Sequence, residues 1–194
     1  MIADATEPVA GGPPPAGVWN IANALTMARI ALVPVFVWLL FLDGTGWRLA
    51  AFAVFAAASV TDKIDGDIAR ARGLVTDFGK IADPIADKAL TGAALVSLSV
   101  MGELWWWVTV AIMVREIGIT VLRFVVIRHG VIPASKGGKL KTMLQVIAIG
   151  FYILPGPLDY VRWATMGAAL VVTVVTGADY VVRAWRMRRR SASS

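Results

Sequence analysis

The chain has 194 residues, of which 58% are hydrophobic, and it carries a formal net charge of +6 and no cysteine. Its apolar content and its mean hydropathy of +0.70 lie well above those of ordinary soluble domains, so the composition indicates an integral membrane protein. The absence of cysteine excludes disulfides and thiolate metal sites. The positive charge is not accompanied by a motif that reads nucleic acid, so we expect no nucleic-acid partner.

The apolar segments predict an all-α fold, an integral membrane bundle of six transmembrane helices that forms one domain over residues 19–187. Residues 1–18 are rich in Pro, Gly and Ala, do not resemble a signal peptide and are predicted to be a disordered tail. Residues 188–194 are predicted to be a basic, Ser-containing tail. The six predicted spans are Leu25–Leu42, Arg48–Ala69, Phe78–Met101, Leu104–Ile127, Lys141–Leu154 and Asp159–Arg183. The fifth is shorter than the roughly 20 residues that a spanning helix needs.

Basic residues fall almost entirely on one side of these predicted spans. Only Arg48 and Arg162 fall on the other side, where five tryptophans gather as in an aromatic belt. The positive-inside rule therefore predicts that the basic side and both termini are cytoplasmic. The positive charge also favours contact with anionic lipid headgroups.

The stretch 61–88 places four aspartates at the cytoplasmic ends of the second and third predicted spans. Asp62 and Asp65 are three residues apart and Asp83 and Asp87 are four apart, so helical spacing puts each pair on one face. Four converging carboxylates would repel one another strongly in a medium of low dielectric constant. Two divalent cations would neutralise them, and the oxygen ligands suit Mg²⁺ or Mn²⁺. Paired ions of this kind also serve phosphoryl displacement.

Two other interpretations of this acidic cluster are open. The aspartates could be interfacial carboxylates that pair with basic neighbours such as Lys63, Arg70 and Lys80, although ionisable groups inside membrane segments are usually functional. The cluster could also bind the permeating ion of a divalent-cation channel or transporter. A conduction path needs polar groups through the full depth of the membrane, whereas the outer halves of the predicted spans are apolar.

The same stretch resembles the signature of the CDP-alcohol phosphotransferase family. It reads Asp62-x-x-Asp65-Gly66-x-x-Ala69-Arg70, then eight residues, then Gly79-x-x-x-Asp83-x-x-x-Asp87. The six-span layout, with the motif across spans two and three, also resembles the family. The resemblance implies that the four aspartates bind two Mg²⁺ ions, with Mn²⁺ as the alternative, and that Asp87 is also the general base. It implies a site for the CDP-diacylglycerol donor formed by Asn23, Thr26, Gly66, Ala69, Arg70, Thr76 and Gly79.

Two later segments bear on the acceptor alcohol. The segment "VREIGITVLRF" places Arg115, Glu116 and Arg123 in the fourth span, where charges need a partner or a polar cavity. The segment "KGGKLKTMLQ" then places lysines and a threonine at the start of the fifth span. Lysine charges and a hydroxyl near a helix N-terminus suit a phosphate. A positive-inside loop is the alternative reading of this second segment.

Both segments, together with residues 20–37, resemble the phosphatidylglycerophosphate synthase branch of that family. This resemblance implies transfer of the phosphatidyl group from CDP-diacylglycerol to sn-glycerol 3-phosphate, giving phosphatidylglycerol phosphate and CMP. The implied glycerol-phosphate site consists of Arg115, Arg123, Lys139, Lys141 and Thr142. The alternative is the same donor chemistry with another acceptor, as in a cardiolipin synthase or a phosphatidylinositol phosphate synthase. The resemblance also implies a homodimer in the bacterial plasma membrane, among membrane lipids, with a cytoplasmic active site.

Overall fold

The computed structural model describes the backbone of residues 21–71, 77–126 and 136–191, and the side chains of residues 24–61, 85–86, 88–122 and 140–182 within these ranges. All regular structure in these ranges is helical, in agreement with the predicted all-α fold. The helices are α1 Ile21–Leu40, α2 Thr45–Ala71, α3 Asp77–Val100, α4 Trp106–Val126, α5 Lys136–Ile153 and α6 Asp159–Ser191. The predicted tail 1–18 lies outside the described residues, and α6 continues into the predicted C-terminal tail.

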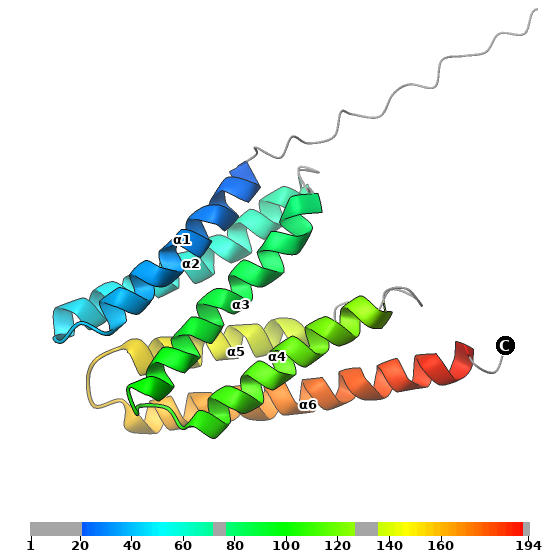
Figure 1. The fold of residues 1–194 in the computed structure, drawn as a ribbon. Helices are drawn as coiled ribbons and strands as arrows, with labels where there is room; N and C mark the ends of the chain where they lie inside the picture. Colours follow the sequence, from blue (N-terminus) through cyan, green and yellow to red (C-terminus); the bar gives the residue numbers. More distant parts are fainter. Residues whose placement is uncertain (1–20, 72–76, 127–135, 192–194) are drawn as a thin grey trace, which may run out of the picture.

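The helices form two groups of three (Figure 1). Helix α1 packs against α2 and α3, and α6 packs against α4 and α5. Contacts of α2 with α5, and of α3 with α4 and α5, join the two groups. The connections 41–44, 101–105 and 154–158 lie at one end of the bundle, which we call the loop end. The predicted site residues on α2 and α3 therefore lie towards the opposite end.

Apolar side chains from both groups fill the core. Phe36 of α1, Phe55 of α2, Leu95 of α3 and Ile149 of α5 are fully buried, and the rings of Phe36 and Phe55 lie 5.7 Å apart. Because lipid is as apolar as these side chains, close packing contributes most to helix association in a membrane. These contacts connect the two groups and set the distance between α3 and α5.

Large apolar side chains also cover the outside of the bundle, where Trp38, Val114, Ile117 and Val171 are exposed. An apolar exterior on this scale indicates an environment other than water. By length and composition, one helix of the described part, Asp159–Val182, could cross a membrane. Shorter apolar helices cover 24–40, 45–61, 88–100 and 140–153.

The six-span layout predicted from the sequence is therefore not confirmed, although the described residues do contain six helices. Within the described side chains, the apolar stretches of α2 and α3 cover 45–61 and 88–100, and each is shorter than the roughly 20 residues of a full span.

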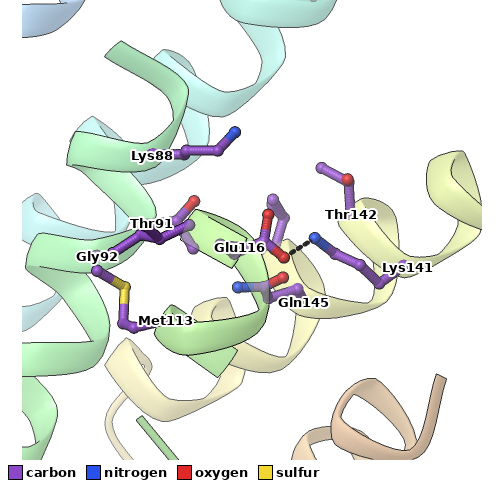
Figure 2. A pocket seen from close by; sticks show the side chains of 10 residues that line it. Lys88, Thr91, Gly92, Met113, Glu116, Lys141, Thr142 and Gln145 are labelled. Atoms are coloured by element: carbon purple, nitrogen blue, oxygen red, sulfur yellow. Dashed lines mark hydrogen bonds and ion pairs between the residues drawn. The ribbon is translucent and has the colours of Figure 1, made fainter. Parts of the chain in front are cut away.

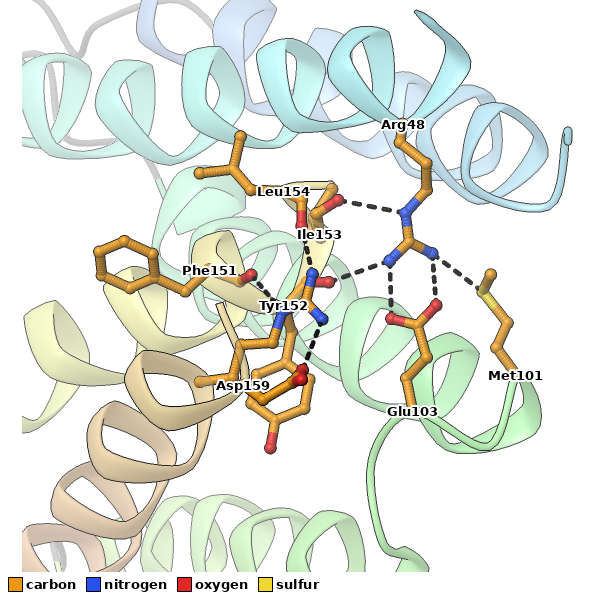
Figure 3. Close-up of polar contacts among 9 residues, drawn as sticks. Arg48, Met101, Glu103, Phe151, Tyr152, Ile153, Leu154 and Asp159 are labelled. Atoms are coloured by element: carbon orange, nitrogen blue, oxygen red, sulfur yellow. Dashed lines mark hydrogen bonds and ion pairs between the residues drawn. The ribbon is translucent and has the colours of Figure 1, made fainter. Parts of the chain in front are cut away.

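Two arginines hold the loop end together (Figure 3). Helix α5 ends at Ile153, so its last carbonyl groups have no donors within the helix. Arg48 of α2 donates from Nε to the Ile153 carbonyl at 3.1 Å and from Nη2 to the Tyr152 carbonyl at 3.0 Å. Its guanidinium also forms a bidentate pair with Glu103, with N–O distances of 2.7 and 2.6 Å. Arg48 therefore joins α2 and α5 to the connection between α3 and α4.

Arg162 of α6 binds the same end of α5. Its Nε donates to the Phe151 carbonyl at 3.0 Å, and its Nη2 donates to the Leu154 carbonyl. We call Arg48, Arg162 and the four carbonyl groups of residues 151–154 the arginine clasp. The two arginines that the sequence sets apart from the other basic residues thus cap one helix and tie it to its neighbours.

Candidate active site

The positions of the family signature lie on two consecutive helices. Residues 62, 65, 66, 69 and 70 belong to the last turns of α2, and residues 79, 83 and 87 to the first turns of α3. The three- and four-residue spacings therefore fall within regular helix, as the sequence predicts. The side chains at these positions, and Thr76 as a whole, lie outside the described residues, so the convergence of the four carboxylates stays a prediction.

Helix α1 brings polar groups to the same end of the bundle. Thr26, predicted to contact the donor, is buried, and so is Arg29 one turn later. The side chain of Asn23 lies outside the described residues. A buried arginine in a helix needs a polar environment, so this end of α1 faces a polar part of the bundle.

A pocket opens between α3, α4 and α5 (Figure 2). Its volume is about 30 Å³, and its walls hold Lys88, Thr91, Gly92, Met113, Glu116, Ile117, Lys141, Thr142, Gln145 and Val146. Thr91 lies one helical turn beyond position 87 on α3, so the pocket begins beside the position of the predicted general base. The structure thus brings Lys141 and Thr142 of the predicted glycerol-phosphate site next to the α3 part of the signature.

Among the described residues of the pocket walls, Glu116 is the acidic one. Its Oε1 accepts hydrogen bonds from Lys141 Nζ and, at 3.1 Å, from Arg115 Nη1. Lys141 is only 4% exposed, and a buried ammonium is costly without a partner. The carboxylate of Glu116 therefore allows a lysine to stand in the pocket wall.

Arg115 lies on a different side of α4. Its Nη2 donates to Thr176 of α6 at 2.9 Å, and its aliphatic part packs against Gly177. Arg115 does not belong to the walls of the pocket, and it touches the pocket through Glu116. The side chains of Arg123 and Lys139, the other predicted phosphate ligands, lie outside the described residues.

The sequence prediction did not include Lys88 or Thr91 of the pocket walls, and it placed Glu116 and Gln145 in the two acceptor segments without making them site residues. Two signals could have found them. Gln145 follows Lys141 by four residues, which places both on one face of α5. Glu116 is an ionisable residue within the fourth predicted span, and ionisable residues in membrane helices usually have a function.

The described side chains include no group of three or more His, Cys, Asp or Glu that could hold a metal ion. The aspartates predicted for this role lie outside that part of the chain. Their chemistry nevertheless fits a hard divalent cation, because carboxylate oxygens are the ligands that such ions prefer.

The family model for CDP-alcohol phosphatidyltransferases matches residues 19–175 of this chain. The match includes α1 to α5, the first half of α6, the signature helices and the pocket. The chain therefore belongs to this family.

Named relatives are similar over most of their length. A Mycobacterium tuberculosis (strain ATCC 25618 / H37Rv) protein named "Probable phosphatidylglycerophosphate synthase" is 53% identical over 176 residues, which cover 88% of this chain and 84% of that protein. A CDP-diacylglycerol–glycerol-3-phosphate 3-phosphatidyltransferase of Bacillus subtilis (strain 168) is 36% identical over 193 residues, covering 90% of this chain and all of the relative. A Rickettsia typhi protein with the same name is 36% identical over 168 residues, covering 83% and 94%.

Proposed function

We propose that this protein transfers the phosphatidyl group of CDP-diacylglycerol to sn-glycerol 3-phosphate, with phosphatidylglycerol phosphate and CMP as products. The observation that carries the proposal is the similarity to relatives named for this reaction, over most of both chains. The family match and the complete signature on α2 and α3 support the donor half of the reaction.

The donor site is proposed to lie at the end of the bundle opposite the loop end. Arg70 is suited to pair with the pyrophosphate, because a guanidinium binds phosphate oxygens bidentately. Gly66, Ala69 and Gly79 leave room for the nucleotide next to the helix backbones. Thr76 and the α1 residues Asn23 and Thr26 complete the proposed donor site.

The four aspartates Asp62, Asp65, Asp83 and Asp87 are proposed to hold two Mg²⁺ ions, with Mn²⁺ as the alternative. A bound metal would supply charge that offsets the pyrophosphate and the departing CMP. Asp87 also takes the proton of the 1-hydroxyl of the acceptor. The hydroxyl oxygen then forms a bond to the phosphorus that carries diacylglycerol, and the bond from that phosphorus to the CMP oxygen breaks.

The acceptor phosphate is proposed to lie at the mouth of the pocket. Lys141 and Thr142 support this placement, because both line the pocket near the N-terminal turns of α5. Arg123 and Lys139 are the remaining proposed ligands. Arg115 contributes through Glu116, which it holds by a hydrogen bond.

The family consists of membrane enzymes, and we place this protein in the bacterial plasma membrane as a multi-pass homodimer. The active site and both termini are proposed to be cytoplasmic, because the basic residues gather on that side of the sequence-predicted spans. Such an orientation gives a water-soluble acceptor access to the pocket.

The decisive experiment presents the purified protein with labelled CDP-diacylglycerol and one alcohol at a time. We expect CMP release and labelled phosphatidylglycerol phosphate with sn-glycerol 3-phosphate, and no transfer to phosphatidylglycerol or inositol phosphate. Transfer to one of these other alcohols alone would replace the proposed acceptor. Divalent-cation flux into proteoliposomes without transfer to any alcohol would instead indicate a transporter.

A further inference from the structure

Gln145 offers a buried hydrogen-bond donor to the pocket. Its side chain is 3% exposed, and its Nε2 has no hydrogen-bond partner among the described residues. Figure 2 shows this nitrogen pointing away from Lys141, towards the α3 side of the pocket. A buried amide nitrogen without an acceptor is unfavourable, so an oxygen atom of a ligand would complete this site.

Glu116 offers an acceptor beside it. Both bonds to its carboxylate, from Arg115 and Lys141, go to Oε1, and within the described part of the chain Oε2 accepts none. Glu116 and Gln145 come from α4 and α5, and both line the pocket (Figure 2). Its walls therefore present an unused donor and an unused acceptor.

The group that fits this pair is a hydroxyl, because it can accept one hydrogen bond and donate another. A phosphate does not fit, since it would be repelled by the carboxylate of Glu116. The pocket volume of about 30 Å³ also suits a group of the size of a water molecule. The charge, the hydrogen-bonding capacity and the size of the pocket thus all favour a hydroxyl group.

We propose that Glu116 and Gln145 bind a free hydroxyl of the acceptor alcohol and so make the enzyme selective for a polyol phosphate over its deoxy analogue. This inference rests on the proposed function. In sn-glycerol 3-phosphate the group is the 2-hydroxyl, because the 1-hydroxyl reacts and the third carbon carries the phosphate. Lys141 and Thr142 then bind the phosphate of the acceptor, while Glu116 and Gln145 bind its 2-hydroxyl, which lies between the phosphate and the reacting 1-hydroxyl.

The test compares sn-glycerol 3-phosphate with 3-hydroxypropyl phosphate, which lacks only the 2-hydroxyl. Both are offered to the full chain with CDP-diacylglycerol, and kcat/KM is measured from CMP release. Sites built to bind a hydroxyl reject analogues without it by about 10⁴-fold or more. For this partly open pocket we expect a preference of at least about 100-fold for the natural alcohol.

Two substitutions remove the pair from opposite sides. Gln145→Met keeps the volume and removes the donor, and Glu116→Met keeps a similar length and removes the acceptor. Each should lower kcat/KM for sn-glycerol 3-phosphate at least about tenfold more than it lowers kcat/KM for the deoxy alcohol. Glu116→Met also lowers the value for the deoxy alcohol, because Glu116 pairs with the proposed phosphate ligand Lys141. Because the ratio compares two substrates on one preparation, it does not depend on the folded fraction.

Thr173→Val is the matched control. Thr173 is fully buried in α6, away from the pocket walls, and its hydroxyl also has no hydrogen-bond partner among the described residues. This substitution should leave the ratio of the two kcat/KM values unchanged.

Two results would overturn the inference and leave the proposed function intact. One is equal use of both alcohols by the unsubstituted enzyme, and the other is an unchanged ratio in both pocket variants. If the unsubstituted enzyme transfers only to an alcohol outside this pair, the proposed function fails, and the inference fails with it.

Discussion

Arg115 and Glu116 are neighbours in α4, but they serve different surfaces, because successive residues of a helix are turned by about 100°. Arg115 reaches Thr176 on α6, whereas Glu116 lines the pocket and binds Lys141. The carboxylate therefore offsets the charge of Lys141 in the pocket wall, and the arginine stabilises the carboxylate. At this scale, the role of each residue depends on the face of the helix that it occupies.

Asp87→Asn tests the proposed general base. An amide cannot take the proton of the attacking hydroxyl, so CMP release should fall by at least about 100-fold, while the helical content stays the same. Steady-state CMP release and circular dichroism measure the two quantities. Asp43→Asn is the control, because Asp43 is exposed in the connection between α1 and α2; turnover of Asp87→Asn at the control rate would contradict the assignment.

Helix α6 holds the second group of helices together through positions where it approaches α4 closely. A Cβ atom at Gly177 would lie 3.1 Å from Cγ of Arg115, while a Cβ at Gly167 would meet no atom within 4 Å. Arg115 cannot easily move away, because its guanidinium nitrogens Nη1 and Nη2 donate to Glu116 and Thr176. Gly177 therefore permits the contact between α4 and α6 that positions Glu116.

Replacing each of these glycines by alanine separates helix propensity from packing. Gly167→Ala should raise the free energy of unfolding by up to about 1 kcal/mol, because alanine favours helix. Gly177→Ala gains the same helix propensity, but the added methyl group crowds Arg115. We therefore expect this change to lower the free energy of unfolding by about 1 kcal/mol or more. Thermal unfolding in detergent measures the difference, and equal stabilisation by both changes would show that α4 and α6 do not pack as described.

For the molecule as a whole, the arginine clasp joins parts of the chain that are far apart in sequence. Arg48 connects α2 to Glu103 and to the end of α5, and Arg162 connects α6 to the same end. These hydrogen bonds satisfy carbonyl groups that would otherwise face an apolar environment. The loop end is thus held by polar contacts, while the core below it is held by packing.

Arg48→Lys tests the clasp while keeping the charge. Lysine cannot form the bidentate pair and reach two carbonyls together, so we expect a loss of about 2 kcal/mol in the free energy of unfolding. Glu103→Gln leaves the contacts of Arg48 with the α5 carbonyls in place, so it should lower the free energy of unfolding less than Arg48→Lys does. The same unfolding measurement serves both variants, and a loss no larger for Arg48→Lys than for Glu103→Gln would argue that capping of α5 is unimportant.

The sequence predicts the helices well and the pocket only in part. Apolar runs between Gly- and Pro-containing turns mark the six helices, and the aspartate spacing agrees with regular helix in α2 and α3. The pairing of Glu116 with Lys141 was not predictable, because it depends on how α4 and α5 are rotated about their axes. That rotation is set by contacts such as those of Arg115 with Gly177, which join distant parts of the chain.

The capped end of α5 has a consequence for the depth of the pocket. Gln145 lies about 12 Å along the helix axis from Ile153, at about 1.5 Å per residue. Sliding α5 by one turn, about 5.4 Å, would bring a side chain to the place of Gly150, where a Cβ atom alone would lie 3.3 Å from the ring of Phe52. The carbonyls held by Arg48 and Arg162 would lose their donors in such a slide. Contacts at the loop end therefore fix the position of α5 along its axis, and with it the level at which Lys141 and Gln145 lie relative to Glu116.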